Sequence, residues 1–159
     1  MTILYVHEES GFREASAGNV IACAQALIAR RYRSGSPVLT SSQRTREYLN
    51  LHIGALEYEV FGCLYVDNRN RLIAIEDLFR GTINGTSVHP REVVKSALNH
   101  GAAGCIAFHN HPSGVAEPSQ ADELITRRLK DALSLVDVCL LDHLIVGEKV
   151  YSFAECGLL

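Results

Sequence analysis

Two dense apolar segments in the middle of the chain predict a β-hairpin. Residues 58–66 and 72–79 are rich in β-branched, aromatic and aliphatic side chains, and they flank Asp67-Asn68-Arg69-Asn70, a run of residues that favour turns. In the first segment, both sets of alternate positions are apolar. A strand with two apolar faces is expected to lie inside a sheet and to be covered on both sides.

After this hairpin, the apolar spacing predicts a helix, a strand and a second helix. Pro90 suits the first turn of the first helix, and Gly101 is placed to end it. Residues 104–108 form a short apolar run that predicts a buried strand. Ser119 begins the second helix, whose apolar positions predict one buried face. Those positions include Leu124, Ile125, Leu129 and Leu133.

Two further strands, over 138–146 and 149–153, are predicted to close the chain around Gly147-Glu148. The order is strand, strand, helix, strand, helix, strand, strand. This order predicts an α/β (α+β) fold with a mixed β-sheet flanked by helices on its faces.

The first third of the chain is predicted to be helical. Apolar residues recur at helical spacing from Val20 to Ile28 and predict an amphipathic helix that must bury its apolar side against another element. A shorter helix is predicted from Ser41-Ser42 to about Leu51. Ser34-Gly35-Ser36-Pro37 is the best candidate for a boundary. Since residues 1–37 are too few for a domain, we expect them to form a helical extension that packs on the main domain, residues 38–159.

Composition and charge narrow the class of protein. The 159 residues are 47% hydrophobic and 21% charged, which is typical of one globular domain with a sizeable core. The net charge of −3 gives no overall positive field to hold nucleic acid by counterion release. No apolar run approaches the roughly 20 residues that span a bilayer, and no secretory signal is present, so we expect a cytoplasmic protein without a membrane partner. The five cysteines form no C-x-x-C pair and are expected to be reduced core thiols.

The candidate chemistry lies where the strand over 104–108 ends. His109 and His111 bracket one residue, and in extended chain such residues point to the same side, so both imidazoles can reach one ion. Asp122, in the first turn of the next helix, is a candidate third ligand. Two histidines, a carboxylate and a water form the open tetrahedral site that is typical of catalytic zinc. Iron and manganese accept the same ligands.

The same residues also allow a purely structural interpretation. Ser119-Gln120-Ala121-Asp122 has the pattern of a capping box, in which Ser119 accepts a backbone N–H and Asp122 complements the helix dipole. An H-x-H pair alone is weak evidence for a metal. Helix capping does not explain, however, why two histidines, a Pro/Gly loop and the cap form one polar block in an otherwise apolar stretch.

The block from His109 to Asp122 resembles the JAMM (MPN-domain) metalloprotease signature, H-x-H-P followed by S-x-x-D. More narrowly, the chain resembles the RadC-like branch of this family over about residues 38–159. The motifs that carry this resemblance are His-Asn-His-Pro-Ser-Gly at 109–114, Phe-Arg-Gly-Thr at 79–82, Pro-Arg-Glu-Val at 90–93 and Leu-Asp-His-Leu-Ile-Val-Gly at 141–147. The resemblance implies a JAMM/MPN-like, cytidine-deaminase-like three-layer α/β/α fold.

The resemblance also implies a role for individual residues. His109, His111 and Asp122 would hold one zinc ion per chain, and Ser119 would help to stabilise the oxyanion. The family requires an upstream glutamate as general base. Glu59 fits best, because RadC-like chains carry a glutamate before a phenylalanine at this strand entry, and Glu57 is the alternative. From the residues alone, Glu59 would be read as a solvated strand end.

The function implied is that of a zinc-dependent hydrolase, a metallopeptidase or isopeptidase that uses a metal-activated water on a peptide or protein substrate. The alternative is a non-catalytic, DNA-repair-associated or protein-binding module with a vestigial metal site. The first 37 residues are too few for the helix-hairpin-helix DNA-binding region that precedes this domain in full-length RadC-like proteins. We therefore expect a short, free-standing form, which weakens any link to DNA repair.

Two further features bear on the site. Asp142 and His143 lie inside an apolar strand, where one of them could orient a metal ligand or both could form a satisfied structural pair.

In the loop from Pro112 to Pro118, the prolines stiffen both ends and Gly114 supplies permissive dihedral angles. We expect this loop to border the metal and to hold the ligands in place before the metal binds.

Overall fold

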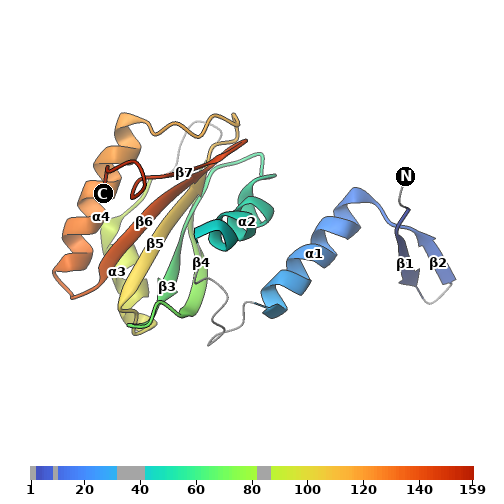
Figure 1. The fold of residues 1–159 in the computed structure, drawn as a ribbon, viewed down its shortest axis with the longest axis horizontal. Coiled ribbons are helices and arrows are strands. Elements are labelled where there is room, and N and C mark those ends of the chain that lie inside the picture. Colours follow the sequence, from blue (N-terminus) through green and yellow to red (C-terminus); the bar gives the residue numbers. More distant parts are fainter. Residues whose placement is uncertain (1–2, 9–10, 32–41, 82–86) are drawn as a thin grey trace.

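The computed structural model describes residues 3–8, 11–31, 42–81 and 87–159. A five-stranded mixed sheet with the strand order β4-β3-β5-β6-β7 forms its centre (Figure 1). All neighbouring strands are antiparallel except β5 and β6, which are parallel. The elements are β1 (Tyr5–Glu8), β2 (Gly11–Glu14), α1 (Ala17–Arg31), α2 (Ser42–Ile53), β3 (Val60–Val66), β4 (Leu72–Arg80), α3 (Pro90–Asn99), β5 (Gly104–Asn110), α4 (Gln120–Ser134), β6 (Cys139–Val146) and β7 (Val150–Ser152).

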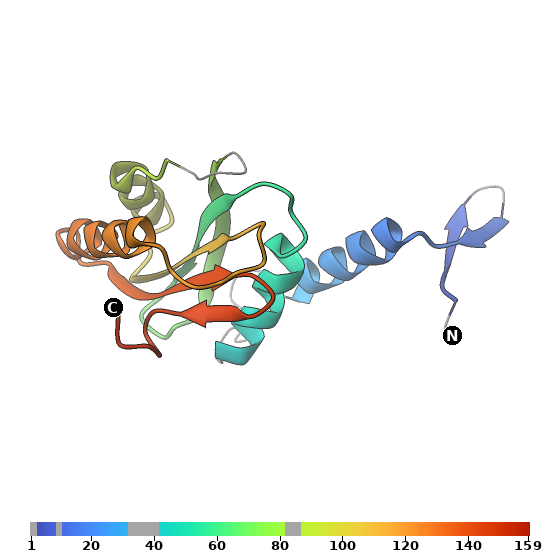
Figure 2. The same ribbon diagram turned by 90° about the horizontal axis from the view of Figure 1, so that it is seen from above.

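Helices cover both faces of the large sheet (Figure 2). On one face, Ile53 of α2 packs in an apolar cluster with Leu64 of β3. On the other face, Val93 of α3 and Leu129 of α4 pack in a second cluster with Tyr65. The structure thus confirms the predicted mixed sheet with helices on its faces, in three layers.

The interior position of β3 is also confirmed. This strand pairs with β4 on one side and β5 on the other, and all seven of its residues are buried. The predicted hairpin joins β3 to β4, and its turn is closed by the Asp67 carboxylate, which accepts the backbone N–H groups of Arg69 and Arg71. Side-chain to backbone hydrogen bonds that are common in turns therefore fix the connection between β3 and β4.

The strand that leads to the two histidines is longer than predicted. β5 continues through His109 and Asn110, two residues beyond the predicted end at 108. At this point His109 pairs with Phe61 of β3 and with Ile145 of β6. Because β3 and β6 pair with β5 on either side, His109 and Asn110 remain part of the strand, although their polar side chains favoured a loop.

The prediction that all five cysteines lie in the core is corrected in part. Cys63 and Cys105 are buried in the sheet as expected, whereas Cys23, Cys139 and Cys156 are exposed. Exposure of Cys139 follows from its position at the first residue of β6.

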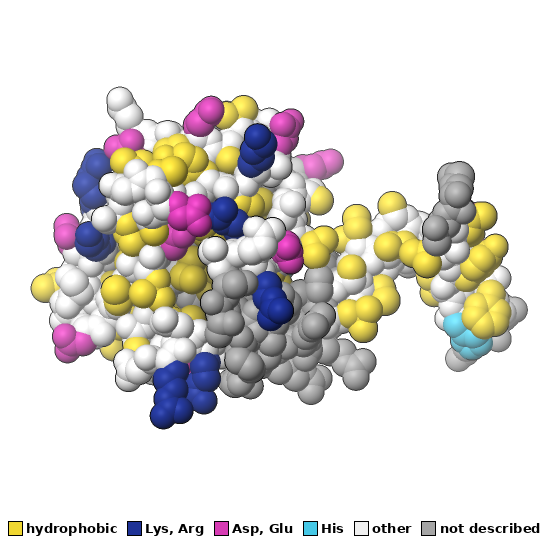
Figure 3. All heavy atoms as spheres, in the orientation of Figure 1, with side chains coloured by type: hydrophobic (Ala, Val, Ile, Leu, Met, Phe, Trp, Pro, Cys, Tyr) yellow, Lys and Arg dark blue, Asp and Glu magenta, His cyan; other side chains and the backbone are white. Residues whose placement is uncertain are grey.

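The N-terminal segment contains a hairpin that the sequence did not predict. β1 and β2 pair with each other and precede the predicted helix α1, at the end of α1 that lies far from the large sheet (Figure 1). Apolar side chains gather along α1 and the hairpin in Figure 3, and Phe12 and Leu27 are more than half exposed. The packing of residues 1–37 on the main domain stays a prediction, because the boundary at 34–37 lies outside the described residues. No helix among those described combines the length and apolarity needed to cross a membrane.

The close packing of β3 gives a first prediction. A Cβ atom at Gly62 would lie 2.4 Å from the ring of Phe108 and 2.4 Å from the carbonyl oxygen of Glu76. We therefore expect Gly62→Ala to lower the free energy of unfolding by about 1–3 kcal/mol, measured by urea titration. Gly18→Ala is the control, because the nearest atom to its Cβ is 3.8 Å away. Equal transition midpoints for the two variants would contradict this packing.

Candidate metal centre

His109, His111 and Asp122 come together where β5 ends and α4 begins. His109 Nε2 lies 3.0 Å from His111 Nε2 and 3.3 Å from Asp122 Oδ1, and His111 Nε2 lies 3.6 Å from Asp122 Oδ2. Ligand atoms around a tetrahedral zinc ion, with bonds of about 2.0–2.2 Å, lie about 3.3–3.6 Å apart. The three side chains therefore lie close enough together to hold one metal ion, with an Nε2–Nε2 distance slightly shorter than that of a bound site.

The hydrogen bonds of His111 test this fit further. Its Nδ1 lies 2.7 Å from the carbonyl oxygen of Val115, which can only accept, so Nδ1 carries a proton. In the neutral ring, Nε2 then presents a lone pair toward His109 Nε2 and the Asp122 carboxylate. A lone pair facing a second imidazole nitrogen and an anion requires a cation between them. Either a proton or a metal ion meets that requirement.

Asp122 combines the two interpretations that the sequence left open. The predicted capping box is confirmed: the Ser119 hydroxyl accepts the Asp122 N–H, and Asp122 Oδ2 accepts the Ser119 N–H at 2.7 Å. The Ser119 hydroxyl donates to the same Oδ2 at 2.6 Å. Oδ1 faces His109 instead. Oδ2 thus caps the helix and also faces His111, while Oδ1 faces His109.

The electrostatics of the cluster favour a bound cation. Burial alone would raise the pKa of the Asp122 carboxyl, but its interactions with His109, His111 and the Ser119 hydroxyl hold this pKa well below its usual range. The hydrogen bond to Asp122 raises the pKa of His111, and burial opposes that rise. The carboxylate is therefore ionised at neutral pH and stabilises positive charge beside it.

The loop over 112–118 is fixed against the turn between β6 and β7. Gly114 has a φ of +83°, and its carbonyl oxygen accepts the Glu148 N–H at 2.8 Å. A Cβ atom at Gly147 would lie 2.3 Å from that same oxygen, so only glycine allows this approach. The approach holds the loop, and with it the Val115 carbonyl that orients His111.

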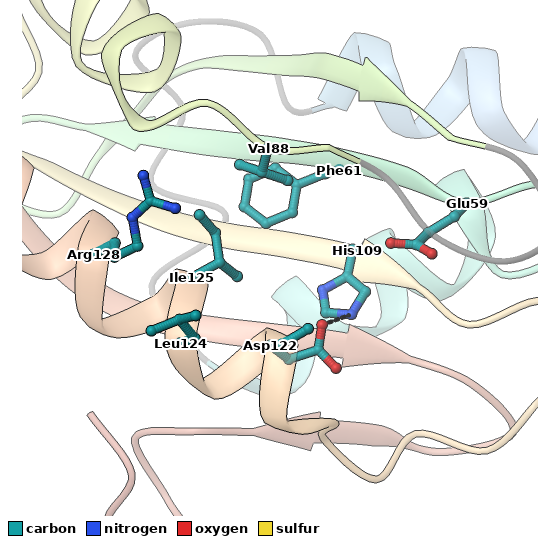
Figure 4. A pocket seen from close by; sticks show the side chains of 9 residues that line it. Glu59, Phe61, Val88, His109, Asp122, Leu124, Ile125 and Arg128 are labelled. Carbon is teal, nitrogen blue, oxygen red and sulfur yellow. Dashed lines mark ion pairs between the residues drawn. The ribbon is translucent and has the colours of Figure 1, made fainter.

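Glu59 is the residue that precedes β3, and it lines a cleft together with His109 and Asp122 (Figure 4). Glu57, the alternative base, is exposed and does not line this cleft. The structure therefore places Glu59 in the same cleft as His109 and Asp122 and leaves Glu57 outside that cleft.

Asn110, which the sequence reasoning missed, holds the backbone on both sides of Glu59. Its Oδ1 accepts the Val60 N–H at 2.8 Å, and its Nδ2 donates to the Tyr58 carbonyl at 3.0 Å. The side chain is 1% exposed, so these bonds are made away from solvent. A polar residue between two candidate ligands at the end of a buried strand was the signal available in the sequence.

The rest of the cleft is apolar, with one cation. Its other walls include Phe61, Val88 and Ile125, and Arg128 lies at the end opposite Glu59 (Figure 4). Leu124 was predicted to be a core residue, yet it is 52% exposed and lines the cleft. The side of α4 that is buried carries Thr126, Leu129 and Leu133, and Leu124 lies outside it.

Asp142 and His143 have separate partners. The Asp142 carboxylate accepts the backbone N–H groups of His143 and Ala154 and the Ser152 hydroxyl, so it fastens β6 to the segment that follows β7. The His143 ring points to the opposite side, where its Nε2 lies 2.9 Å from His109 Nδ1. Burial lowers the pKa of His143, so this ring is neutral at pH 7.

The mixed sheet, its helices on both faces and the His-His-Asp group define an α/β domain of the JAB/MPN-like kind. Residues 39–158 match the family model described as the RadC-like JAB domain, and the chain belongs to this family. The resemblance seen in the sequence motifs is thus confirmed.

Curated relatives agree with this assignment. The chain is 62% identical to a UPF0758 protein of Thioalkalivibrio sulfidiphilus, over 76% of this chain and 54% of that protein. It is 60% identical to the UPF0758 protein YkfG of Escherichia coli, over 76% of this chain and 77% of that protein. A UPF0758 protein of Vibrio cholerae is 52% identical over 82% of each chain. The chain spans about half the length of the first of these relatives.

The position of Asn110 gives a second prediction. Asn110→Ala leaves the buried Val60 N–H and Tyr58 carbonyl without their side-chain partner, and we expect a loss of about 1–3 kcal/mol in the free energy of unfolding. Asn99→Ala, at the exposed end of α3, is the matched control and should leave stability unchanged. Urea titration measures both. A loss no larger than that of the control would show that Asn110 does not hold this backbone.

Removal of metal gives a third prediction. The two apolar clusters on the faces of the sheet include none of the candidate ligands, so we expect the fold not to depend on an ion. We expect the chelated protein to keep a cooperative thermal transition. Zinc at a hundredfold excess over its dissociation constant should add about 2.7 kcal/mol. Circular dichroism follows both states. Unfolding at room temperature on chelation would instead make the metal a structural element, as in a zinc finger.

Proposed function

We propose that this protein is a zinc-dependent hydrolase of the metallopeptidase or isopeptidase type, acting on an amide bond of a peptide or protein. The observation that carries the proposal is the opening of one cleft onto a candidate metal group and a nearby carboxylate, Glu59. Membership of the RadC-like JAB family supports it. His109, His111 and Asp122 would hold the ion, whose Lewis acidity would acidify water and polarise a carbonyl.

Glu59 is the proposed general base. It lies beside the ligand group and belongs to neither the metal cluster nor an ion pair among the described residues. A carboxylate so placed accepts a proton from the attacking water and returns it to the leaving nitrogen. Asn110 holds the backbone that carries Glu59, so the base approaches the cleft from a fixed direction.

Ser119 is the proposed donor to the oxyanion. Its hydroxyl donates to Asp122 Oδ2 in this structure, so a turn of one side-chain torsion is needed to aim the proton at substrate. Asp122 Oδ2 keeps the Ser119 backbone N–H while the hydroxyl turns away. The helix cap therefore survives the catalytic use of the hydroxyl.

The cleft also supports a substrate class. Phe61, Val88 and Ile125 offer an apolar wall beside the ligand group. Arg128 forms no ion pair with any described residue, and its guanidinium lies at the far end of the cleft (Figure 4). These walls favour an apolar side chain next to the reacting bond and a carboxylate further along the substrate.

The role of Glu59 gives a fourth prediction. We expect Glu59→Gln to bind zinc as wild-type protein does and to lose at least about a hundredfold in turnover, the usual contribution of general acid–base catalysis. Glu57→Gln, two residues away and outside the cleft, should keep full activity. Each zinc-loaded protein is incubated with a proteome-derived peptide library, and new chain ends are counted by mass spectrometry.

Two outcomes would count against this account. Equal numbers of new chain ends from wild type and Glu59→Gln would remove Glu59 as the base. No cleavage by zinc-loaded wild-type protein, of linear or of lysine-branched peptides, would favour the alternative of a non-catalytic module that keeps a metal site.

A further inference from the structure

His143 is a buried polar residue with no role in the proposed reaction. Its side chain is fully buried, and its ring stacks on Phe153 and meets the edge of Phe61. A buried imidazole needs a hydrogen-bond partner at both nitrogens, because an unpaired polar group is costly in the core. His143 has two such partners, Thr126 at Nδ1 and His109 at Nε2.

The direction of these hydrogen bonds follows from the Asp122 carbonyl oxygen, which contacts Thr126. The Thr126 hydroxyl lies 2.5 Å from the Asp122 carbonyl oxygen, which can only accept, so the hydroxyl donates its proton there. The hydroxyl oxygen is then the acceptor for His143 Nδ1, 2.6 Å away. His143 Nδ1 therefore carries the proton of this neutral ring, and its Nε2 has a lone pair.

The proton on His143 Nδ1 also determines the tautomer of His109, the first proposed ligand. His143 Nε2 accepts, so His109 Nδ1, at 2.9 Å, must donate. A neutral His109 with its proton on Nδ1 presents the lone pair of Nε2 to His111 and Asp122. All three groups of this path, His109, His143 and Thr126, are at most 1% exposed, so water does not supply alternative partners.

We propose that His143 and Thr126 are positioning residues that set the tautomer of His109, so that its Nε2 is free to bind metal. The hydrogen-bond chain runs from His109 through His143 and Thr126 to the Asp122 carbonyl, and so joins two of the proposed ligands. Near-parallel stacking of Phe61 on His109 fixes the plane of the first ring. The inference rests on the proposed function, because it assigns these residues to the same metal group.

Thr126 offers the cleaner test, because it does not touch the candidate metal position. Thr126→Val keeps the shape of the side chain and removes the hydroxyl, whereas Thr126→Ser keeps the hydroxyl. Without that acceptor, a proton on His143 Nδ1 has nothing to donate to, whereas a proton on Nε2 can be donated to His109 Nδ1. We therefore expect the proton of His143 to move to Nε2, which leaves the proton of His109 on its own Nε2. A protonated Nε2 competes with metal. We expect Thr126→Val to bind zinc about 10–100-fold more weakly than wild type, and Thr126→Ser to bind it nearly as wild type does.

Two measurements follow from this design. Zinc affinity is determined by competition with a chelating dye, and thermal melts show that each variant is folded. Nitrogen-15 NMR of metal-free protein reads directly whether Nδ1 of His109 and Nδ1 of His143 carry a proton. We expect protons on Nδ1 of His109 and His143 in wild type and Thr126→Ser, and on Nε2 of both in Thr126→Val. A loss of packing alone would not move the protons of both rings from Nδ1 to Nε2.

Failure of this inference is distinct from failure of the proposed function. Wild-type tautomers and wild-type zinc affinity in Thr126→Val would overturn the role of the chain while leaving the metal site intact. An unprotonated Nδ1 of His109 in metal-free wild type would overturn it directly. Absence of zinc binding by wild-type protein would overturn the proposed function, and the tautomers of the metal-free protein would still decide the direction of the hydrogen bonds.

Discussion

The site depends on one constraint, the continuation of β5 as a strand through His109 and Asn110 between two paired neighbours. This pairing buries both side chains almost completely. Buried polar groups must find partners, and each of these residues finds them in the parts of the fold that the proposed reaction uses. Asn110 binds the backbone around Glu59, and His109 binds His143 and faces Asp122. Burial thereby fixes the positions of the proposed base and the proposed ligands together.

The capping box shows how one residue serves both stability and chemistry. Asp122 uses Oδ2 to close the first turn of α4 and turns Oδ1 toward His109. The structural and the metal-binding interpretations of this carboxylate are therefore compatible, because Oδ2 makes the cap while Oδ1 faces His109. The cap contributes roughly 1 kcal/mol of helix stability and also fixes the side chain of the proposed third ligand.

Local patterns in the sequence were enough for much of the fold. The hairpin of β3 and β4, the start and end of α3, and the cap of α4 depend on neighbouring residues, and all of them are confirmed. The end of β5, by contrast, is set by pairing with strands far away in the chain, and its two polar residues gave the wrong boundary. Asn110 was overlooked for the same reason, since its partners lie 50 and 52 residues away. The family motif supplied the ligand residues, but only the three-dimensional structure shows how Leu124 opens toward the cleft and where His143 points.

The central claim is that His109, His111 and Asp122 hold one divalent metal ion through the free Nε2 atoms of the two imidazoles. Diffraction from zinc-soaked crystals, recorded on both sides of the zinc absorption edge, tests this claim most directly. The account predicts one strong anomalous peak within about 2.0–2.2 Å of His109 Nε2, His111 Nε2 and an Asp122 carboxylate oxygen. Zinc bound only elsewhere, with the two Nε2 atoms still hydrogen-bonded to each other, would contradict it.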